Sequence, residues 1–291
     1  MTRQDPSRLH RTWLIAFAMG AASTLLACSG PVPLGSSLVG GSGANGPNPS
    51  GGIDLSTHGS GAGSTGSTGA GGAGGDCPNY VIAVIRDFRG WVGPNGEPKH
   101  PDFEPGVGHY GDDLGLVDTT LGSDKKPVYA PAGATLTVSG ADSFNQWYRD
   151  TDGVNMRFEI NLPLTADPLV SGGLAYDNGT FFPIDNQGFG NQGQTHNYSF
   201  STEIHTTFIY RGGETFTFTG DDDVFVFVNN QRVIDLGGIH IAENKLVSFD
   251  QQGLTVGQTY PMDIFHAERH VVASHFRMET KFECLTPIVI P

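Results

Sequence analysis

Apolar and polar residues alternate in several short segments after about residue 80, and this pattern predicts β-strands. The segments are rich in β-branched and aromatic residues, and Gly, Asn and Asp separate them, as expected for strands joined by turns. They are Val81–Ile85, Thr135–Val138, Met156–Ile160, Thr215–Thr219 and Val224–Val228. No segment shows a convincing amphipathic helical period.

One of these segments, Val224–Val228, is apolar on both faces, which indicates a strand buried at the centre of the fold. Asn229-Asn230-Gln231 follows it, and because Asn tolerates left-handed backbone we expect a turn there into a partner strand, Arg232–Leu236. Residues 77–291 are numerous enough for one substantial core. We therefore predict an all-β domain with a β-sandwich or jelly-roll-like body.

The first 27 residues have the pattern of an export signal. Three arginines make a basic start, and a mostly apolar run from Trp13 to Ala27 follows. This run is shorter than the about 20 residues that a permanent membrane helix needs. Leu25–Cys28 resembles a bacterial lipobox, which implies that the Cys28 thiol is acylated and anchors the chain to a membrane. Ser29, rather than Asp, follows the cysteine, and in this the chain resembles lipoproteins that are sent to the outer membrane. The alternative is an ordinary signal peptide in which Cys28 has no special role.

Residues 28–76 consist almost entirely of Gly, Ser, Ala, Thr and Pro, which predicts a disordered linker. A Gly-rich coil of this length has an r.m.s. span of roughly 35–40 Å. The whole chain has 16 basic and 30 acidic residues, a net charge of −14. Such a surface disfavours nucleic acid and anionic lipid as partners. We therefore expect a domain at the cell surface, held to the membrane by its lipid anchor alone.

The cysteine count fits this organisation. Lipidation of Cys28 leaves Cys77 and Cys284, which flank every segment predicted to fold. Disulfides persist outside the cell, so we expect these two to be bonded. Two unpaired thiols are the alternative.

The sharpest chemical feature is Gly220-Asp221-Asp222-Asp223, which lies between two strong strand patterns. Three adjacent carboxylates repel one another unless a cation or hydrogen-bond donors neutralise them. Clustered carboxylate oxygens suit a hard ion such as Ca²⁺. Asp221, Asp222 and Asp223 are therefore candidate metal ligands, and a solvated acidic turn is the alternative. Asp150–Asn155 also has alternating oxygen side chains, but it lacks the later Glu of a calcium loop and favours a plain turn.

Other constellations point to weaker hypotheses. On a strand, His266, Glu268 and His270 would share one face and suit a zinc ion, with His275 or His240 as a further ligand. Structural hydrogen bonds and an Arg269–carboxylate pair are the alternatives. The chain has no nucleophile elbow, phosphate loop or dinucleotide fingerprint. We therefore predict no enzyme activity; glycoside hydrolysis by a pair of carboxylates is the alternative.

Aromatic residues offer a further hypothesis. Trp91, Trp147 and Tyr148 are of the kind that stacks on sugar rings, although aromatics of a β-domain more often fill its core.

A series of unusual motifs, in order from about Tyr80 to Leu285, resembles the fibro-slime domain family. The motifs are Ile85–Phe88, His100–Glu104, Phe144–Asp150, Phe181–Asp185, Gly188–Asn191, His196–Tyr198, Gly220–Asn229, Asp235–His240 and Phe265–His270. That family is similar in turn to the protective-antigen-type β-sandwich of yeast flocculins and cell-surface adhesins.

The resemblance implies that Asp221 and Asp222 hold Ca²⁺, with Asp223 adjacent and Asn229-Asn230 at the position of a second family motif. Asp223 and Asn230 both stand where many relatives carry Gly. The leading hypothesis is a surface binding or adhesion module for carbohydrate or extracellular matrix. The alternatives are a structural slime or envelope component without a specific ligand, and a carbohydrate-active enzyme.

Overall fold

The computed structural model describes residues 77–167 and 171–289. Cys28 and the boundaries of the predicted leader and linker, 1–27 and 28–76, lie outside these residues. Within the described part of the chain, no helix has the length and hydropathy needed to cross a membrane.

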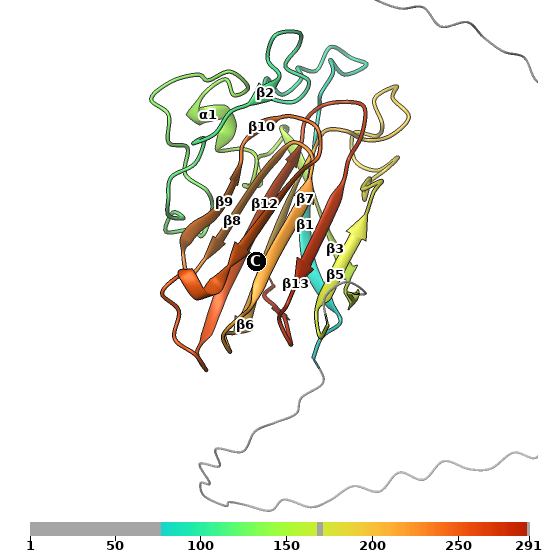
Figure 1. The fold of residues 1–291 in the computed structure, drawn as a ribbon. Helices are drawn as coiled ribbons and strands as arrows, with labels where there is room; N and C mark the ends of the chain where they lie inside the picture. The colour runs from blue at the N-terminus through green and yellow to red at the C-terminus, as the bar shows by residue number, and fades with distance from the viewer. Residues whose placement is uncertain (1–76, 168–170, 290–291) are drawn as a thin grey trace, which may run out of the picture. The chain divides into compact units, whose positions relative to one another are not determined.

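The described residues form an antiparallel β-sandwich of two main sheets (Figure 1). The large sheet has the strand order β3-β1-β6-β12-β8-β9, with β14 paired to one end of β6. Its strands are β1 (Tyr80–Phe88), β3 (Asn155–Pro163), β6 (Phe200–Ile209), β8 (Asp223–Val228), β9 (Gln231–Leu236), β12 (Thr259–Glu268) and β14 (Thr286–Pro287). The prediction of an all-β sandwich is confirmed.

The small sheet has the order β11-β7-β13-β5-β4. Its strands are β4 (Thr165–Ala166), β5 (Leu174–Asn178), β7 (Thr215–Gly220), β11 (Glu243–Ser248) and β13 (Phe276–Thr280). A separate two-residue pairing joins β2 (Gly111–Asp112) to β10 (Gly238–Ile239). The helical elements of the described residues are the single turn α1 (Ala141–Phe144) and the 3₁₀ turn η1 (Phe249–Gln251).

The main core lies between the two sheets and follows from the alternation in the sequence. Phe216 and Phe218 of β7 are fully buried and face the core, whereas the Thr residues between them are only partly buried. Ile204 of β6 and Ile264 of β12 meet them from the large sheet. Burial of large apolar side chains from both sheets provides the main driving force for this packing.

The large sheet is covered on its other face as well. Residues 89–154, between β1 and β3, form a loop layer that packs Trp147, Tyr148 and Phe103 against Phe225 and Phe265 of β8 and β12. This second core explains why every residue of β8 is buried. The prediction of a central strand apolar on both faces is confirmed. Trp147 and Tyr148 are therefore core residues, with no surface available for a sugar.

One predicted strand is wrong. Thr135–Val138 lies in the loop layer and is not part of any strand. The hydroxyls of Thr135 and Thr137 donate to one carboxylate oxygen of Asp113, at 2.6 and 2.9 Å, and the Thr137 N–H donates to the same atom. Side-chain hydrogen bonds of this kind compete with ladder pairing. Alternation alone could not reveal that the hydroxyl face of this segment binds a carboxylate.

Charged side chains are buried where the loop layer meets β1, β6 and β12. His205 lies between two carboxylates, with Nδ1 2.6 Å from Asp263 and Nε2 2.6 Å from Glu203. Arg86 and Lys126 also pair with Glu203. Burial by itself raises the pKa of Glu203, but these cationic partners outweigh it and lower the pKa to about 2. Burial lowers the pKa of His205, and hydrogen bonds to the carboxylates reverse this, so the net shift is upward.

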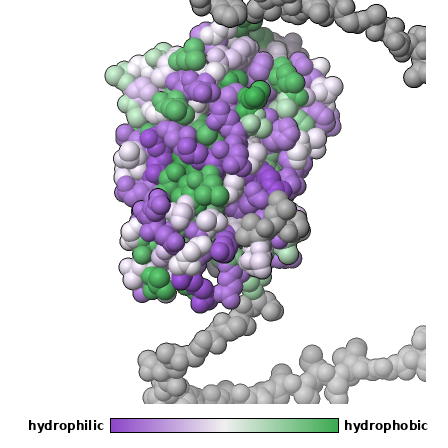
Figure 2. Space-filling model, viewed as in Figure 1, coloured by the Kyte–Doolittle hydropathy of each residue, from purple (hydrophilic) through white to green (hydrophobic). Residues whose placement is uncertain are grey.

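The ends of the domain are joined covalently. Cys77 and Cys284 form a disulfide, with their Cα atoms 5.6 Å apart. This confirms the predicted pairing and closes a loop that contains nearly all of the described strands. The face of the domain visible in Figure 2 is mainly hydrophilic, with separate hydrophobic patches.

Candidate functional site

Three connections between the two sheets meet at one end of the sandwich. The chain passes from β7 of the small sheet to β8 of the large sheet through only Asp221 and Asp222. It returns from β9 to β11 through residues 237–242, and from β12 to β13 through residues 269–275. We call these the crossovers. They place the acidic motif at an end of the sandwich where three connections join the two sheets.

Local sequence explains the sharp Asp221–Asp222 connection. Asp222 has a φ of +46°, a left-handed conformation that Asp adopts more readily than most residues. Gly220 lies immediately before this connection, and a Cβ on it would lie 2.5 Å from the Phe218 ring and 2.7 Å from the His275 carbonyl oxygen. Glycine is therefore required at this position.

The crossovers enclose a pocket of about 560 Å³, which we call the crossover pocket. Its volume is in the range of small-molecule sites. Asp221 and Asp222 are two of its lining residues, and Tyr110 reaches it from the loop layer. The walls are mainly apolar and include Ile241 and Val272, whose side chains are 86% and 84% exposed. Two carboxylates thus lie beside apolar, solvent-exposed loops.

Backbone and imidazole groups hold the two carboxylates. Asp222 accepts hydrogen bonds from the N–H of His240 at 3.2 Å and from the N–H of Arg269 at 2.8 Å. Asp221 accepts one from the N–H of His275 at 2.5 Å, and its second oxygen lies 3.2 Å from Nδ1 of the same histidine. Each crossover therefore contributes to the positions of the acidic side chains.

Asp223 has a different environment from its two neighbours. It is fully buried, does not line the crossover pocket, and accepts a hydrogen bond from Nε of Arg269 at 2.5 Å. Arg269 is also fully buried and donates to the carbonyl oxygen of Thr137 at 2.8 Å. Its guanidinium lies 4.5 Å from the centre of the Trp147 ring. This confirms an Arg269–carboxylate pair and shows that Asp223 is separated from Asp221 and Asp222.

In this region the carboxylates of Asp221 and Asp222 form no ion pair with a lysine or arginine side chain of the described residues. Arg269 balances Asp223, and burial raises the pKa of Glu268 well above its ordinary value, which favours its uncharged form. Burial also raises the pKa of Asp222 to about 7, because the charge of Arg269 only partly offsets desolvation. No Lys or Arg among the described residues lines the pocket. Asp221 and Asp222 are therefore the two carboxylates of the pocket that a divalent cation would neutralise if it bound there.

The histidine hypothesis is not reproduced by the arrangement of the described residues. His266 and Glu268 are buried residues of β12. His270 lies beyond the end of that strand, where its Nδ1 is 3.0 Å from the Glu104 carboxylate and its ring stacks on Tyr110. Burial lowers the pKa of His266 to about 4. Within the described ranges, no group of three His, Cys, Asp or Glu side chains has an arrangement suited to a metal ion. A cation at Asp221 and Asp222 would therefore need carbonyl, water or ligand oxygens as well.

The second motif implied by the family resemblance is far from this site. Asn229 and Asn230 have positive φ values and form the turn between β8 and β9, as predicted. They lie at the opposite end of β8 from Asp222, at a distance of about 20 Å for a strand of this length. They therefore take no part in the crossover pocket. Within the segment Asp150–Asn155, residues 152–154 form the predicted turn and Asn155 begins β3.

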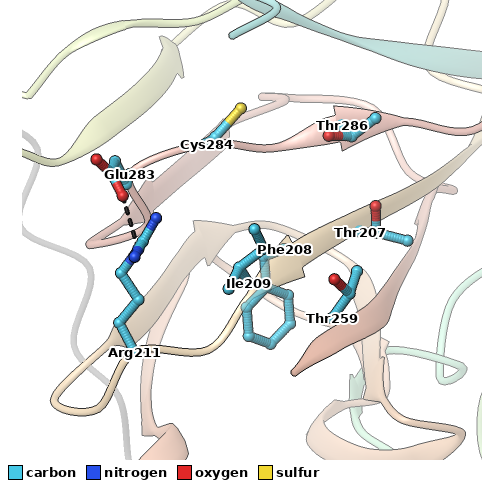
Figure 3. Close-up of a pocket in the computed structure, with 8 residues that line it drawn as sticks. All are labelled: Thr207, Phe208, Ile209, Arg211, Thr259, Glu283, Cys284 and Thr286. Carbon is cyan, nitrogen blue, oxygen red and sulfur yellow. Dashed lines mark ion pairs between the residues drawn. The ribbon is translucent and has the colours of Figure 1, made fainter. Parts of the chain in front are cut away.

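A smaller pocket lies at the other end of the sandwich (Figure 3). Its volume is about 170 Å³, and Arg211 and Glu283 form an ion pair of 2.7 Å at its edge. Cys284 of the disulfide also lines it. The volume is below the usual range of ligand sites, so we regard it as a surface depression beside the disulfide.

Sequence reasoning found Asp221 and Asp222, named His240 and His275 only as further ligands of a zinc site, and missed Tyr110. These three residues complete the pocket from segments far apart in the chain. The Nε2 atom of His240 is buried and has no hydrogen-bond partner among the described residues. A histidine directly after a strand does not by itself indicate a binding site. His240 becomes a candidate because the three crossovers bring it to the same pocket as Asp221 and Asp222.

Comparison with known proteins agrees with this architecture. Residues 173–286 match the model of the PA14 domain, a range that includes Asp221, Asp222 and all three crossovers. The chain is 41% identical to Protein psiQ of Dictyostelium discoideum over 186 residues, which is 60% of this chain and 19% of psiQ. It is 39% identical to Protein psiD of the same organism over 203 residues, which is 64% of this chain and 40% of psiD. The chain thus spans less than half the length of these relatives.

Among solved structures, the chain is similar to one described as the PA14 sugar-binding domain from an RTX adhesin. The alignment covers 72% of this chain and 95% of that chain, with 9% sequence identity and a TM-score of 0.31.

Proposed function

We propose that this chain is a carbohydrate-binding or adhesion module whose ligand site is the crossover pocket, with Ca²⁺ held by Asp221 and Asp222. The observation that carries the proposal is the pair of buried carboxylates that line the pocket, because no described lysine or arginine lines it and the Arg269 side chain pairs with Asp223 instead. The match to the PA14 domain model covers both residues.

The geometry suggests how the parts divide the work. A bound Ca²⁺ would neutralise the two carboxylates and offer open coordination positions to sugar hydroxyls. The side chains of Ile241 and Val272 would contact the apolar face of a sugar ring, and Tyr110 would contact its edge. Hydrogen bonds from the His240, Arg269 and His275 backbone fix the carboxylates in advance, which reduces the entropic cost of binding.

Isothermal titration calorimetry of the full chain with CaCl₂ tests the metal claim. We expect saturable binding with a dissociation constant of about 0.1–1 mM, as for other extracellular modules. Asp221→Asn combined with Asp222→Asn should abolish it, whereas Asp150→Asn, at a carboxylate that is 57% exposed, should leave it unchanged. Equal binding by the double variant and the native chain would refute the assignment.

A glycan array tests the ligand claim. The full chain should bind at least one glycan class with Ca²⁺ present and lose that binding in EDTA. A glycan signal that is equally strong with Ca²⁺, in EDTA and in the double variant would exclude the crossover pocket as the Ca²⁺-dependent site.

We also propose surface display through a lipid at Cys28, as the lipobox pattern implies. Cys28 lies outside the described residues, so the support is the sequence alone. Mass spectrometry of the N-terminal peptide from membranes of a lipoprotein-processing host tests this. We expect diacylglycerol on Cys28 and a soluble chain after Cys28→Ser; an unmodified cysteine would refute it.

A further inference from the structure

A second groove lies on the same end of the sandwich as the crossover pocket but on a different part of the large sheet. It has a volume of about 630 Å³ and is formed by residues 89–97 of the loop layer, residues 188–192 and Met156. No residue lines both pockets. Strands β6 and β12 lie between β1, which leads into this groove, and β8, which follows Asp222, so β1 and β8 are about 14 Å apart. We call it the Trp91 groove.

The lining residues combine flat apolar surfaces with polar groups. Trp91 is only partly buried, in contrast to the fully buried Trp147. The guanidinium carbon of Arg89 lies 3.8 Å from the centre of the Phe189 ring, and both residues line the groove. Such surfaces suit a sugar ring, which presents C–H groups on its faces and hydroxyls at its edges.

The walls of the groove are held in place without a ligand. The Gln192 side chain donates to the carbonyl oxygen of Phe88 at 2.9 Å and accepts from the Trp91 N–H at 3.2 Å, so it ties the two walls together. The Phe189 N–H donates to the buried Asp87 carboxylate at 2.5 Å. A preformed groove pays less ordering entropy when it binds.

Glycine fixes the same wall more firmly. Gly188 has a φ of +59°, and a Cβ there would lie 2.1 Å from a carboxylate oxygen of Asp87. The residue can therefore only be glycine if Phe189 is to keep its position.

The charges of the groove select the type of sugar. Arg89 and Glu97 contribute one charge of each sign. The Glu97 carboxylate accepts hydrogen bonds from the backbone and side chain of Asn95, at 2.9 and 3.1 Å. The Arg89 guanidinium donates one hydrogen bond to the described residues, a long one of 3.5 Å to the Gly153 carbonyl oxygen. Its remaining N–H groups are therefore available to hydroxyl oxygens, and an uncharged sugar fits the balanced charge.

We propose that the Trp91 groove binds one uncharged sugar unit of a glycan, stacked on Trp91, without a divalent cation. The proposal rests on the carbohydrate-binding function proposed above and adds a second contact site to it. A glycan held at both places would gain avidity, because the second contact becomes intramolecular.

Tryptophan fluorescence isolates this groove. The full chain with Trp13→Phe contains two indoles, and Trp147 is fully buried, so acrylamide quenching reports on Trp91. The test adds Asp222→Asn and EDTA to disable the crossover pocket. Cellohexaose, maltohexaose, mannohexaose and chitohexaose serve as probes, each at about 10 mM, which saturates sites of millimolar affinity.

We expect at least one probe to lower the quenching of Trp91 at least about twofold, as stacking on one face of an indole requires. Gln192→Ala, which frees the walls but keeps Trp91, should weaken the binding of that probe about tenfold. Tyr110→Ala, in the crossover pocket, is the matched control and should leave it unchanged. Absence of protection by all four probes in a chain with native circular dichroism would overturn the proposal.

The two functions can fail separately. Trp91→Ala in Ca²⁺ leaves only the crossover pocket, and its glycan-array signal measures that site. Array binding by Trp91→Ala together with unprotected Trp91 in EDTA would refute the groove and keep the proposed function. Protection of Trp91 in EDTA without any Ca²⁺-dependent array signal would support the groove and refute the function proposed for the crossover pocket.

Discussion

Arg269 is the residue whose loss we expect to damage the domain most, and Arg269→Met is the change that tests this. Methionine retains much of the length and apolar contact of the arginine side chain but removes its charge and donors. Asp223 would then be a fully buried carboxylate without its partner. The Thr137 carbonyl oxygen, 2.8 Å from Nη1, would lose its donor as well.

The magnitude follows from burial. Removal of one partner of a buried ion pair costs about 3–5 kcal/mol, because the remaining charge stays in a medium of low dielectric constant. The Arg269–Asp223 pair has side chains that are both 0% exposed, so no water can replace the guanidinium. With a urea m-value of about 2 kcal/mol/M, the midpoint of unfolding should fall by about 2 M.

Urea unfolding followed by circular dichroism measures this shift. Arg149→Met is the matched control, because Arg149 pairs with Asp124 on the surface, with side chains 31% and 47% exposed. We expect it to cost less than about 1 kcal/mol. Arg269→Met with Asp223→Leu should recover most of the loss, since both buried charges are then gone. A loss below 1 kcal/mol in Arg269→Met, or a double variant no more stable than the single one, would refute the reasoning.

Three further predictions concern other parts of the fold. Replacing Cys77 and Cys284 together by Ser should lower the free energy of unfolding by up to about 5 kcal/mol, as the loop-entropy model gives for a separation of 207 residues; an unchanged urea midpoint would contradict it. Gly188→Ala should lower the free energy of unfolding by about 1–3 kcal/mol, because alanine would have to adopt the left-handed backbone of this position and its Cβ has no room. A variant that melts at the same temperature as the native chain would argue against this. Because the pKa of His205 is raised on folding, its stabilising contribution is complete below about pH 6.5 and is lost as pH rises through the folded-state pKa. The stability gap between the native chain and His205→Gln should therefore narrow from about pH 5.5 to 8.5, and a gap that widens would disprove the sign.

The sequence predicts the strands well where side chains alternate between core and solvent. Phe216 and Phe218 follow this rule, and Val224–Val228 signals burial on both faces. The pattern fails at Thr135 and Thr137, whose hydroxyls bind Asp113 instead of facing water beside a strand. Contacts with residues far away in the sequence determine whether an alternating segment forms a strand, and the alternation itself does not show these contacts.

The candidate site is predictable only in part. Three successive aspartates suggest a cation, but nothing local separates Asp223 from Asp221 and Asp222. The separation arises because Asp223 is the first residue of β8 and pairs with the buried Arg269, whereas Asp221 and Asp222 form the connection before the strand, with Asp222 in a left-handed conformation. Likewise, the crossover pocket exists because three connections between sheets meet at one end, which is a property of topology.

The positions of the crossovers and the disulfide also have a mechanical consequence. Cys77 precedes β1, and Asp222 precedes β8, at opposite ends of the large sheet. A ligand held at the crossover pocket and a pull on the chain before residue 77 would stretch the domain parallel to its strands. Force in that direction shears many ladder hydrogen bonds of β6 and β12 at once, rather than opening them one after another. The arrangement suits a module that must resist drag while it holds its ligand.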